Sequence, residues 1–389
     1  MRSMGKARQV FNLDSKRVLL RYLRIHNLAV RLPLTNLKEA FRNVGFKESL
    51  EVALSARVDK LDVESIKKIW EEGAIIRSGE SHIMLAEQWY SLSGLLEPIN
   101  EEELCAKEPQ LNDLINLLDL KAFPIYQLVK TNIIEQLKDR PKTKDELLKN
   151  LLQVVLMELP PAKRGVWNWP STTQEALTIG EEILRILFPI AVQSSPICLE
   201  VKGGKVDYQY RLFNGRQANE NIAKMYLKGY GPANCQDFAT WANISFVQAD
   251  RLWKELSPGE ISEVNLEGQR GVMLTEDFDS LKGTEEVEEI RFIGYDDPLL
   301  AIPQRSLLVQ GKKLQNYFFN SKGTSPGMVL NGSEVIAGWH LKIKRDSFSV
   351  KIEDVGLGLG RVATQEVEYE IEKLASSLGL KSEGFSVSS

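Results

Sequence analysis

The chain has 389 residues, of which 43% are hydrophobic and 26% are charged, and its formal net charge is -4. This composition is that of a soluble globular protein, and the length is sufficient for two or more domains. The slightly acidic balance excludes a protein coated in positive charge, so any nucleic acid would have to bind through local basic patches.

The cysteines and the apolar segments exclude several further classes. Cys105, Cys198 and Cys235 are scattered and have neither the spacing of a metal site nor that of a disulfide framework. Residues 1–12 lack the apolar core of a secretory signal, and no apolar run reaches the ~20 residues that a membrane helix requires. We therefore expect a cytoplasmic monomer with no metal, no cofactor and no membrane partner.

Residues 14–96 are predicted to form a first module of helices and short strands. Apolar residues share one helical face at its start, namely Val18, Leu19, Tyr22 and Leu23. Further helices are expected at 37–43, 47–58 and 63–72, and strands at 74–76 and 82–85.

A helical connector is predicted at 97–138, followed by a second module at 139–213. Two capping boxes, in which a threonine and a glutamate three residues later cap the same helix end, are formed by Thr143 with Glu146 and by Thr178 with Glu181. A hairpin then turns at two glycines that lie between Lys202 and Lys205.

Residues 218–280 show three helices and another glycine-tipped hairpin. The first helix stops at Gly229-Tyr230-Gly231-Pro232, because glycine and proline end a helix and redirect the chain. Ser245 is expected to cap the third helix, and two strand-like runs flank residues 267–270. This order is typical of a winged-helix module, whose third helix lies in the major groove of DNA. A helical subdomain that only supports other parts is the alternative.

The remaining chain is predicted to be rich in strands. Alternating and β-branched residues favour strands at 290–293, 327–330, 335–343 and 347–352, within a domain at 288–378 that closes with a helix. A serine-rich tail at 379–389 is expected to be disordered. The predicted fold class is α+β, with tandem winged-helix modules and a C-terminal β-rich domain.

One segment resembles a known family. The Tyr-Gly-Pro-Ala run at 230–233, followed by Asp-Phe-Ala at 237–239 and Trp241, is similar to the winged-helix DNA-binding family that includes bacterial glycosylases able to unhook interstrand crosslinks. Weaker similarities follow in the same order along the chain, at 56–58, 79–87, 293–306, 329–332 and 338–339. The resemblance implies three tandem winged helices and a β-rich domain around a DNA channel.

The resemblance also implies catalytic positions. Family members use a Gln-apolar-Gln or Gln-apolar-Asp motif to stabilise positive charge on the sugar and to position a water. Alignment from residues 56–58 places this motif at Asn43-Val44-Gly45, where glycine removes the second polar group, while a shifted register brings in Glu48 as a general base. Asn43, Glu48 and the strand residue His82 are therefore catalytic candidates; a helix-end asparagine and a partly buried histidine are the alternatives.

Polar and basic residues on the third helix, the hairpins and the last strands are candidate DNA contacts, because such side chains bind base edges and phosphates. They are Ser245, Gln248, Arg251, Lys254, Arg270, Lys202, Lys205, Lys342, Lys344 and Arg345. Solvated lysines on a hairpin or strand would show the same pattern.

Three functions remain open at this point. The first is a protein that binds double-stranded, possibly damaged DNA and whose standard catalytic motif is altered. The second is an active glycosylase that hydrolyses the N-glycosidic bond of alkylated or crosslinked purines. The third is a winged-helix regulator or scaffold that binds other proteins.

Overall fold

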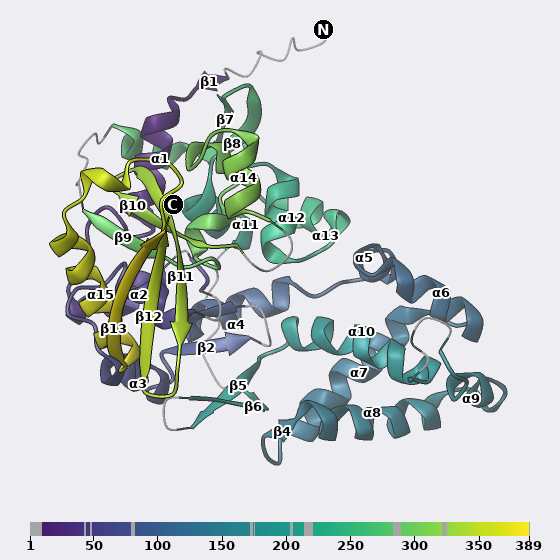
Figure 1. The fold of residues 1–389 in the computed structure, drawn as a ribbon. Coiled ribbons are helices and arrows are strands. Elements are labelled where there is room, and N and C mark those ends of the chain that lie inside the picture. Colours follow the sequence, from purple (N-terminus) through teal and green to yellow (C-terminus); the bar gives the residue numbers. More distant parts are fainter. Residues whose placement is uncertain are drawn as a thin grey trace, which may run out of the picture. The chain divides into compact units, whose positions relative to one another are not determined.

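The computed structural model describes residues 10–42, 44–46, 49–78, 82–171, 174, 176–202, 205–213, 221–282, 289–320 and 325–388. The chain divides into two compact units, and it passes from one to the other more than once (Figure 1). Unit 1 comprises Met1–Ile69, Ala223–Asn234 and Leu256–Ser389, and unit 2 comprises Trp70–Ile222 and Cys235–Glu255. Helices and sheets are both present, as expected.

Unit 1 contains a large sheet, a small sheet and several short helices. Its helices are α1 (Ser15–Ile25), η1 (Leu34–Phe41), α2 (Leu50–Ser55), most of α3 (Val63–Glu71), most of α11 (Ile222–Tyr230), η2 (Thr275–Leu281), η3 (Pro298–Ala301), η4 (Arg305–Leu307), α14 (Lys312–Phe318), η5 (Leu359–Arg361) and α15 (Thr364–Leu378). Its strands are β1 (Phe11–Asn12), β7 (Ile261–Leu266), β8 (Gln269–Leu274), β9 (Ile290–Ile293), β10 (Gly327–Asn331), β11 (Glu334–Ile343), β12 (Ser347–Glu353) and β13 (Lys381–Ser388).

The C-terminal strands form the five-stranded sheet that the sequence predicts in part. Its order is β13-β12-β11-β10-β9, and all neighbours are antiparallel except β12 and β13. Apolar side chains on one face pack with α15 around Trp339 and Phe348. The other face of β11 and β12 carries polar residues, because side chains alternate along a strand.

The prediction of a disordered tail at 379–389 is wrong for residues 381–388. These residues form β13, which pairs in parallel with β12 from Ser347 to Glu353. Phe385 packs against the core of the sheet. Backbone pairing with an edge strand thus outweighs the serine-rich composition on which the prediction depends.

The hairpin of residues 261–274 is confirmed, and a third strand joins it. Strands β7 and β8 turn at Glu267 and Gly268, whose φ angles are 51° and 85°. Both angles lie in the left-handed region that a tight two-residue hairpin turn uses. Strand β1, which the sequence did not predict, pairs in parallel with β7.

Unit 2 is mainly helical. Its helices are α4 (Ala86–Leu95), α5 (Glu101–Lys107), α6 (Pro109–Leu118), α7 (Ala122–Leu137), α8 (Lys144–Glu158), α9 (Pro161–Trp167), α10 (Ile179–Gln193), α12 (Cys235–Ala242) and α13 (Phe246–Trp253). Its strands are β2 (Ile75–Ser78), β3 (His82–Leu85), β4 (Lys142–Thr143), β5 (Ile197–Lys202) and β6 (Lys205–Leu212).

Both predicted capping boxes are present. The Thr143 hydroxyl accepts from the Glu146 amide at the start of α8, and the Glu146 carboxylate accepts from the Thr143 amide. Thr178 and Glu181 exchange the same two bonds at the start of α10. Each box satisfies backbone groups that the helix itself leaves unpaired.

The segment at 97–138 is helical as predicted, but it is not a connector between separate modules. Leu111 and Leu118 of α6 and Val129 of α7 belong to the same buried core as Leu147 of α8 and Leu187 of α10. Because the apolar faces of these helices cover one another, 97–138 and 139–213 share a single core.

The two units also divide two of the predicted modules. The module predicted at 218–280 has most of α11, β7 and β8 in unit 1, whereas α12 and α13 belong to unit 2.

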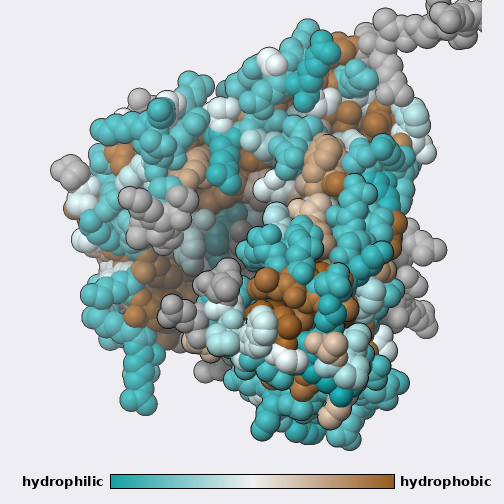
Figure 2. Space-filling view, turned by 90° about the vertical axis from the view of Figure 1, so that its right-hand side faces the viewer, coloured by the Kyte–Doolittle hydropathy of each residue, from teal (hydrophilic) through white to brown (hydrophobic). Residues whose placement is uncertain are grey.

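On the face drawn in Figure 2 hydrophilic residues predominate, and hydrophobic residues gather mainly in the lower part of the picture. Exposed hydrophobic residues at the start of α13 are Phe246 and Val247.

Candidate functional site

A buried ion pair fixes the centre of unit 1. The Arg57 guanidinium donates to both oxygens of Asp297, at 2.8 and 2.6 Å, and both side chains are fully buried. Arg57 also donates to the Ala53 carbonyl at 2.7 Å, and Asp297 accepts from the Leu299 amide at 2.9 Å. The pair therefore joins the end of α2 to the start of η3.

His26 lies beside this pair at the end of α1. Its Nε2 lies 3.2 Å from the Gly229 carbonyl, to which the neutral Nε2–H tautomer donates. Burial, together with the positive charge of Arg57, lowers the pKa of His26 to about 3. The histidine is therefore neutral at physiological pH, and it serves as a hydrogen-bond donor inside unit 1.

Side chains of helix α1 donate hydrogen bonds to backbone carbonyl groups in and just before the Tyr-Gly-Pro-Ala run. Arg21 donates to the Gly231 and Lys228 carbonyls at 2.7 and 3.0 Å, and it pairs with Asp277 at 2.6 Å. The Tyr22 hydroxyl donates to the Tyr230 carbonyl at 3.1 Å. These carbonyls lie at the end of α11, where a helix leaves its last acceptors unsatisfied. Side chains of α1 supply the missing donors.

The described part of the predicted catalytic segment is buried and anchored. Val44 and Phe46 are buried, and the Phe46 ring contacts Phe41 edge to face at 4.8 Å between centroids. The Ser49 amide donates to the Asp296 carboxylate at 3.0 Å. Two of the three predicted catalytic residues, Asn43 and Glu48, lie outside the described residues. Ser49, the neighbour of Glu48, is thus bound to Asp296, the residue next to the Asp297 that pairs with Arg57.

Glu51 is an acid in this region that sequence reasoning missed. It stands in the first turn of α2 and is half-buried, and this burial raises the pKa of its carboxyl. Its carboxylate forms neither an ion pair nor a hydrogen bond with another described residue, apart from the bond to its own amide. A raised pKa keeps a carboxyl protonated up to a higher pH, which is a property of proton donors in active sites. The available sequence signal was a glutamate between Leu50 and Val52.

Three predicted DNA contacts of α13 are engaged inside unit 2. Ser245 caps the helix by accepting from the Gln248 amide at 3.2 Å. The Gln248 side chain is 2% exposed, and it donates to the Leu96 carbonyl at 2.7 Å. Arg251 pairs with Glu103 of α5 at 2.8 Å. These side chains hold α13 against neighbouring segments, and only Lys254 extends into solvent, where it pairs with Asp250 at 2.5 Å.

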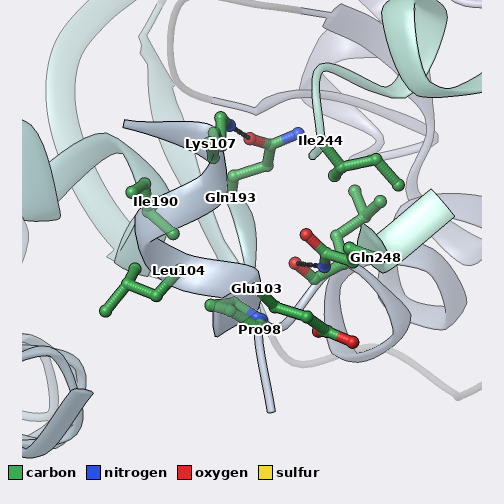
Figure 3. A pocket seen from close by; sticks show the side chains of 9 residues that line it. Pro98, Glu103, Leu104, Lys107, Ile190, Gln193, Ile244 and Gln248 are labelled. Carbon is green, nitrogen blue, oxygen red and sulfur yellow. Dashed lines mark hydrogen bonds between the residues drawn. The ribbon is translucent and has the colours of Figure 1, made fainter. Parts of the chain in front are cut away.

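Figure 3 shows the small cavity beside Gln248. Gln193 and Lys107 face the same cavity and are joined by a hydrogen bond of 3.3 Å. The cavity has a volume of about 10 Å³, which is room for at most one water molecule. A base or a sugar does not fit into it.

The other predicted contacts lie on hairpins. Arg270 is exposed on β8, opposite Asn265 of β7. Lys202 and Lys205 pair across the β5–β6 hairpin, and His82 pairs with Ser78 across β2 and β3, but only the backbones of these four residues are described.

Lys342, Lys344 and Arg345 lie at the end of β11 and in the turn after it. All three are exposed. Lys344 pairs with Glu383 of β13 at 2.6 Å. Neither Lys342 nor Arg345 forms an ion pair or hydrogen bond within the described part of the chain, so their charges remain available to a ligand.

Comparisons with known proteins decide the family. The family model described as "DNA glycosylase AlkZ-like" matches residues 47–377. The chain belongs to the AlkZ-like DNA glycosylase family. The matched range contains the ion pair of Arg57 and Asp297, the Tyr-Gly-Pro-Ala run and strands β9 to β12 of the C-terminal sheet.

Individual relatives agree with this family. An interstrand DNA cross-link repair glycosylase of Streptomyces sahachiroi is 26% identical over 128 residues, so that the match spans 32% of this chain and about a third, 34%, of the relative. The solved structure of the Streptomyces sahachiroi DNA glycosylase AlkZ is similar with a TM-score of 0.65 at 16% identity. This likeness covers 97% of this chain and 100% of that chain, and it shows the fold.

Two further findings concern all described residues. None of their helices is both long and apolar enough to cross a membrane. Their histidine, cysteine, aspartate and glutamate side chains form no group of three that could hold a metal ion.

Proposed function

We propose that this member of the AlkZ-like family binds double-stranded DNA that carries damaged bases, and that its standard catalytic motif is altered. Family membership over residues 47–377 is the observation that carries the proposal, because it supplies DNA as the class of ligand. The altered motif is inferred from the alignment, in which Gly45 provides no side chain where the family has its second polar group.

The exposed face of β11 and β12 supports DNA as the ligand. Lys342 and Lys344 alternate with Leu341 and therefore point to the face opposite the apolar core. Lys351 of β12 lies on the same face, in register with His340, and pairs with Glu353 at 2.6 Å. Positive side chains along a strand can contact successive phosphates and release their counterions.

Three winged-helix modules remain part of the proposal. Helices followed by a hairpin occur at α8 to β6 and at α11 to β8, and a shorter set occurs before α4. We infer that the hairpin of the third module lies along the DNA backbone, since the polar side chains of α13 are engaged by unit 2. The protein is proposed to act as a monomer.

Binding is tested by fluorescence anisotropy with a labelled duplex at several salt concentrations. The proposal predicts that log K falls linearly with log salt, with a slope of about 0.9 per phosphate contact. Replacing both Lys342 and Arg345 by Ala should lower the slope, whereas K138A, which removes an exposed lysine that is paired with Glu135, should not. A full-length protein without measurable affinity at 50 mM salt would instead support a protein-binding scaffold.

An active glycosylase is the second candidate, and the state of Glu51 favours it. A half-buried carboxylic acid with a raised pKa can protonate a leaving base, which is the proton transfer that cleavage of an N-glycosidic bond requires. If base release is observed, E51Q should lower the single-turnover rate by about 100-fold or more, and the fall in rate at high pH, where the Glu51 proton donor is deprotonated, should disappear. An unchanged rate in E51Q would remove Glu51 from this role.

A further inference from the structure

The tip of the β7–β8 hairpin is tied to two distant segments by one carboxylate. Glu267, the first residue of the turn, accepts from the Ser15 hydroxyl at 2.8 Å and from the Ser306 hydroxyl at 3.1 Å. Ser15 begins α1, and Ser306 lies in η4. The two hydrogen bonds bring the start of α1, the hairpin tip and η4 together at Glu267. All three elements belong to unit 1.

Strand β1 fixes the same arrangement from a second direction. Asn265 of β7 donates to the Asn12 side chain at 2.8 Å, and its carbonyl accepts from the Leu13 amide at 2.9 Å. Phe11 contacts Phe278 edge to face at 5.2 Å. The chain thus enters α1 alongside the hairpin, as Figure 1 shows for β1, β7 and β8.

Four exposed cations are carried by these three elements. Lys16 and Arg17 directly follow Ser15, Arg305 directly precedes Ser306, and Arg270 stands three residues after Glu267. The Arg305 guanidinium lies 4.7 Å from the centre of the Phe319 ring, which restricts its orientation. Arg17, Arg270 and Arg305 form no ion pair with any acid among the described residues. We name Arg17, Arg270 and Arg305 the wing-tip basic patch.

Two carboxylates carried by these elements bind neutral donors. Asp14 caps α1 by accepting from the Arg17 amide at 2.9 Å, and Glu267 is bound by the two serine hydroxyls. The carboxylates of Asp14 and Glu267 therefore accept from neutral donors, whereas the three arginines form no ion pair with a described acid. Such a surface carries a local positive charge even though the whole chain is acidic.

We propose that the wing-tip basic patch binds the phosphate backbone of double-stranded DNA as one surface, on which α1, the hairpin and η4 meet at Glu267. The proposal rests on the proposed function, DNA binding, and adds a second contact surface to that of β11 and β12. Arginine favours phosphate as the ligand, because the planar guanidinium matches two phosphate oxygens at once.

The test compares the salt dependence of duplex binding in full-length variants. Because each lost phosphate contact lowers the slope of log K against log salt by about 0.9, R17Q/R270Q/R305Q should show a slope lower by about two to three. R140Q is the matched control, because Arg140 is an exposed arginine of unit 2 that is already paired with Glu146 at 2.7 Å. Its slope should equal that of the wild type.

E267Q provides a variant with the opposite expected effect. The glutamine oxygen can still accept from a serine, but the negative charge beside the phosphates is removed, so duplex affinity should rise severalfold. A merely structural role of the hairpin tip would instead weaken binding in both E267Q and the triple variant. A triple variant with the wild-type slope would overturn the wing-tip patch while DNA binding stands. Absence of duplex binding in the wild type would overturn both proposals.

Discussion

At the scale of single residues, the buried pair of Arg57 and Asp297 joins two distant segments of unit 1. Both side chains are fully buried, so removing one charge leaves the other without compensation in a low-dielectric interior. D297N should lower the free energy of unfolding by about 3–5 kcal/mol in urea denaturation. E39Q, which removes an exposed partner of Arg42, should change it by about 0–1 kcal/mol. Equal effects of the two variants would contradict the importance given to the pair.

His26 leads to a prediction about acid. Its pKa is about 3 in the folded protein and about 6.5 when unfolded, so the unfolded chain binds the additional proton between these values. Stability due to neutral His26 is therefore complete above pH 6.5, and it is lost as the pH falls towards 3. The slope in this window is about 1.4 kcal/mol per pH unit. In H26Q the free energy of unfolding should fall less steeply between pH 6.5 and 5; an unchanged slope would disprove a buried neutral histidine.

The residues of α13 show how far sequence reasoning reaches at this scale. Ser245 was predicted as a helix cap and is one, because capping depends on residues within the same turn. The periodicity of α13 also places Gln248 and Arg251 off its apolar face. This periodicity does not reveal that Leu96 and Glu103, about 150 positions earlier, bind Gln248 and Arg251 on the polar face of the helix. Local patterns therefore identified polar side chains but not their partners.

At the scale of elements, the start of α10 is packed against an aromatic ring. A Cβ atom added at Gly180 would lie 2.2 Å from the Trp167 indole, and Trp167 is fully buried in α9. G180A should therefore destabilise the fold by about 1–3 kcal/mol through overpacking. Gly165 is also helical and has no atom within 4 Å of an added Cβ, so G165A should stabilise the fold by at most about 1 kcal/mol. Thermal unfolding of both variants measures the difference, and an identical effect would refute the close contact.

Strand β13 is a second element with a direct test. Its backbone pairs with β12, so the amides around Phe385 and Val387 should exchange with deuterium much more slowly than in the denatured chain. Hydrogen exchange followed by mass spectrometry of a peptide covering 381–388 gives the rates. Rates equal to those of the denatured protein would restore the predicted disordered tail.

Elements with local signals were predicted well, and elements that depend on distant partners were not. The boxes at Thr143 and Thr178 and the turn at Glu267 and Gly268 are encoded within a few residues. Strand β1 is short and strand β13 is weakly apolar, and both exist because β7 and β12 offer free edges. Such pairings are invisible to periodicity, which evaluates one segment at a time.

At the scale of the whole molecule, the order of the predicted modules does not match the compact units. Unit 1 collects three separate stretches of the chain, and unit 2 collects two. Composition changes along the sequence indicate linkers, but here the chain leaves a unit between Ile69 and Trp70, inside α3, and again after Ile222, the first residue of α11. The resemblance at 230–233 nevertheless identified the family, because it depends on residue identity and not on domain boundaries.

The central claim is that the chain binds damaged duplex DNA with an altered catalytic motif. The most direct measurement is a single-turnover gel assay, in which excess protein is mixed with a duplex carrying a nitrogen-mustard-type crosslink and the product is heated with base. The same mixture is also run on a native gel. We expect a shifted duplex on the native gel and no strand break at abasic sites. Strand breaks would show an active glycosylase and contradict the altered motif, and an unshifted duplex would contradict DNA binding.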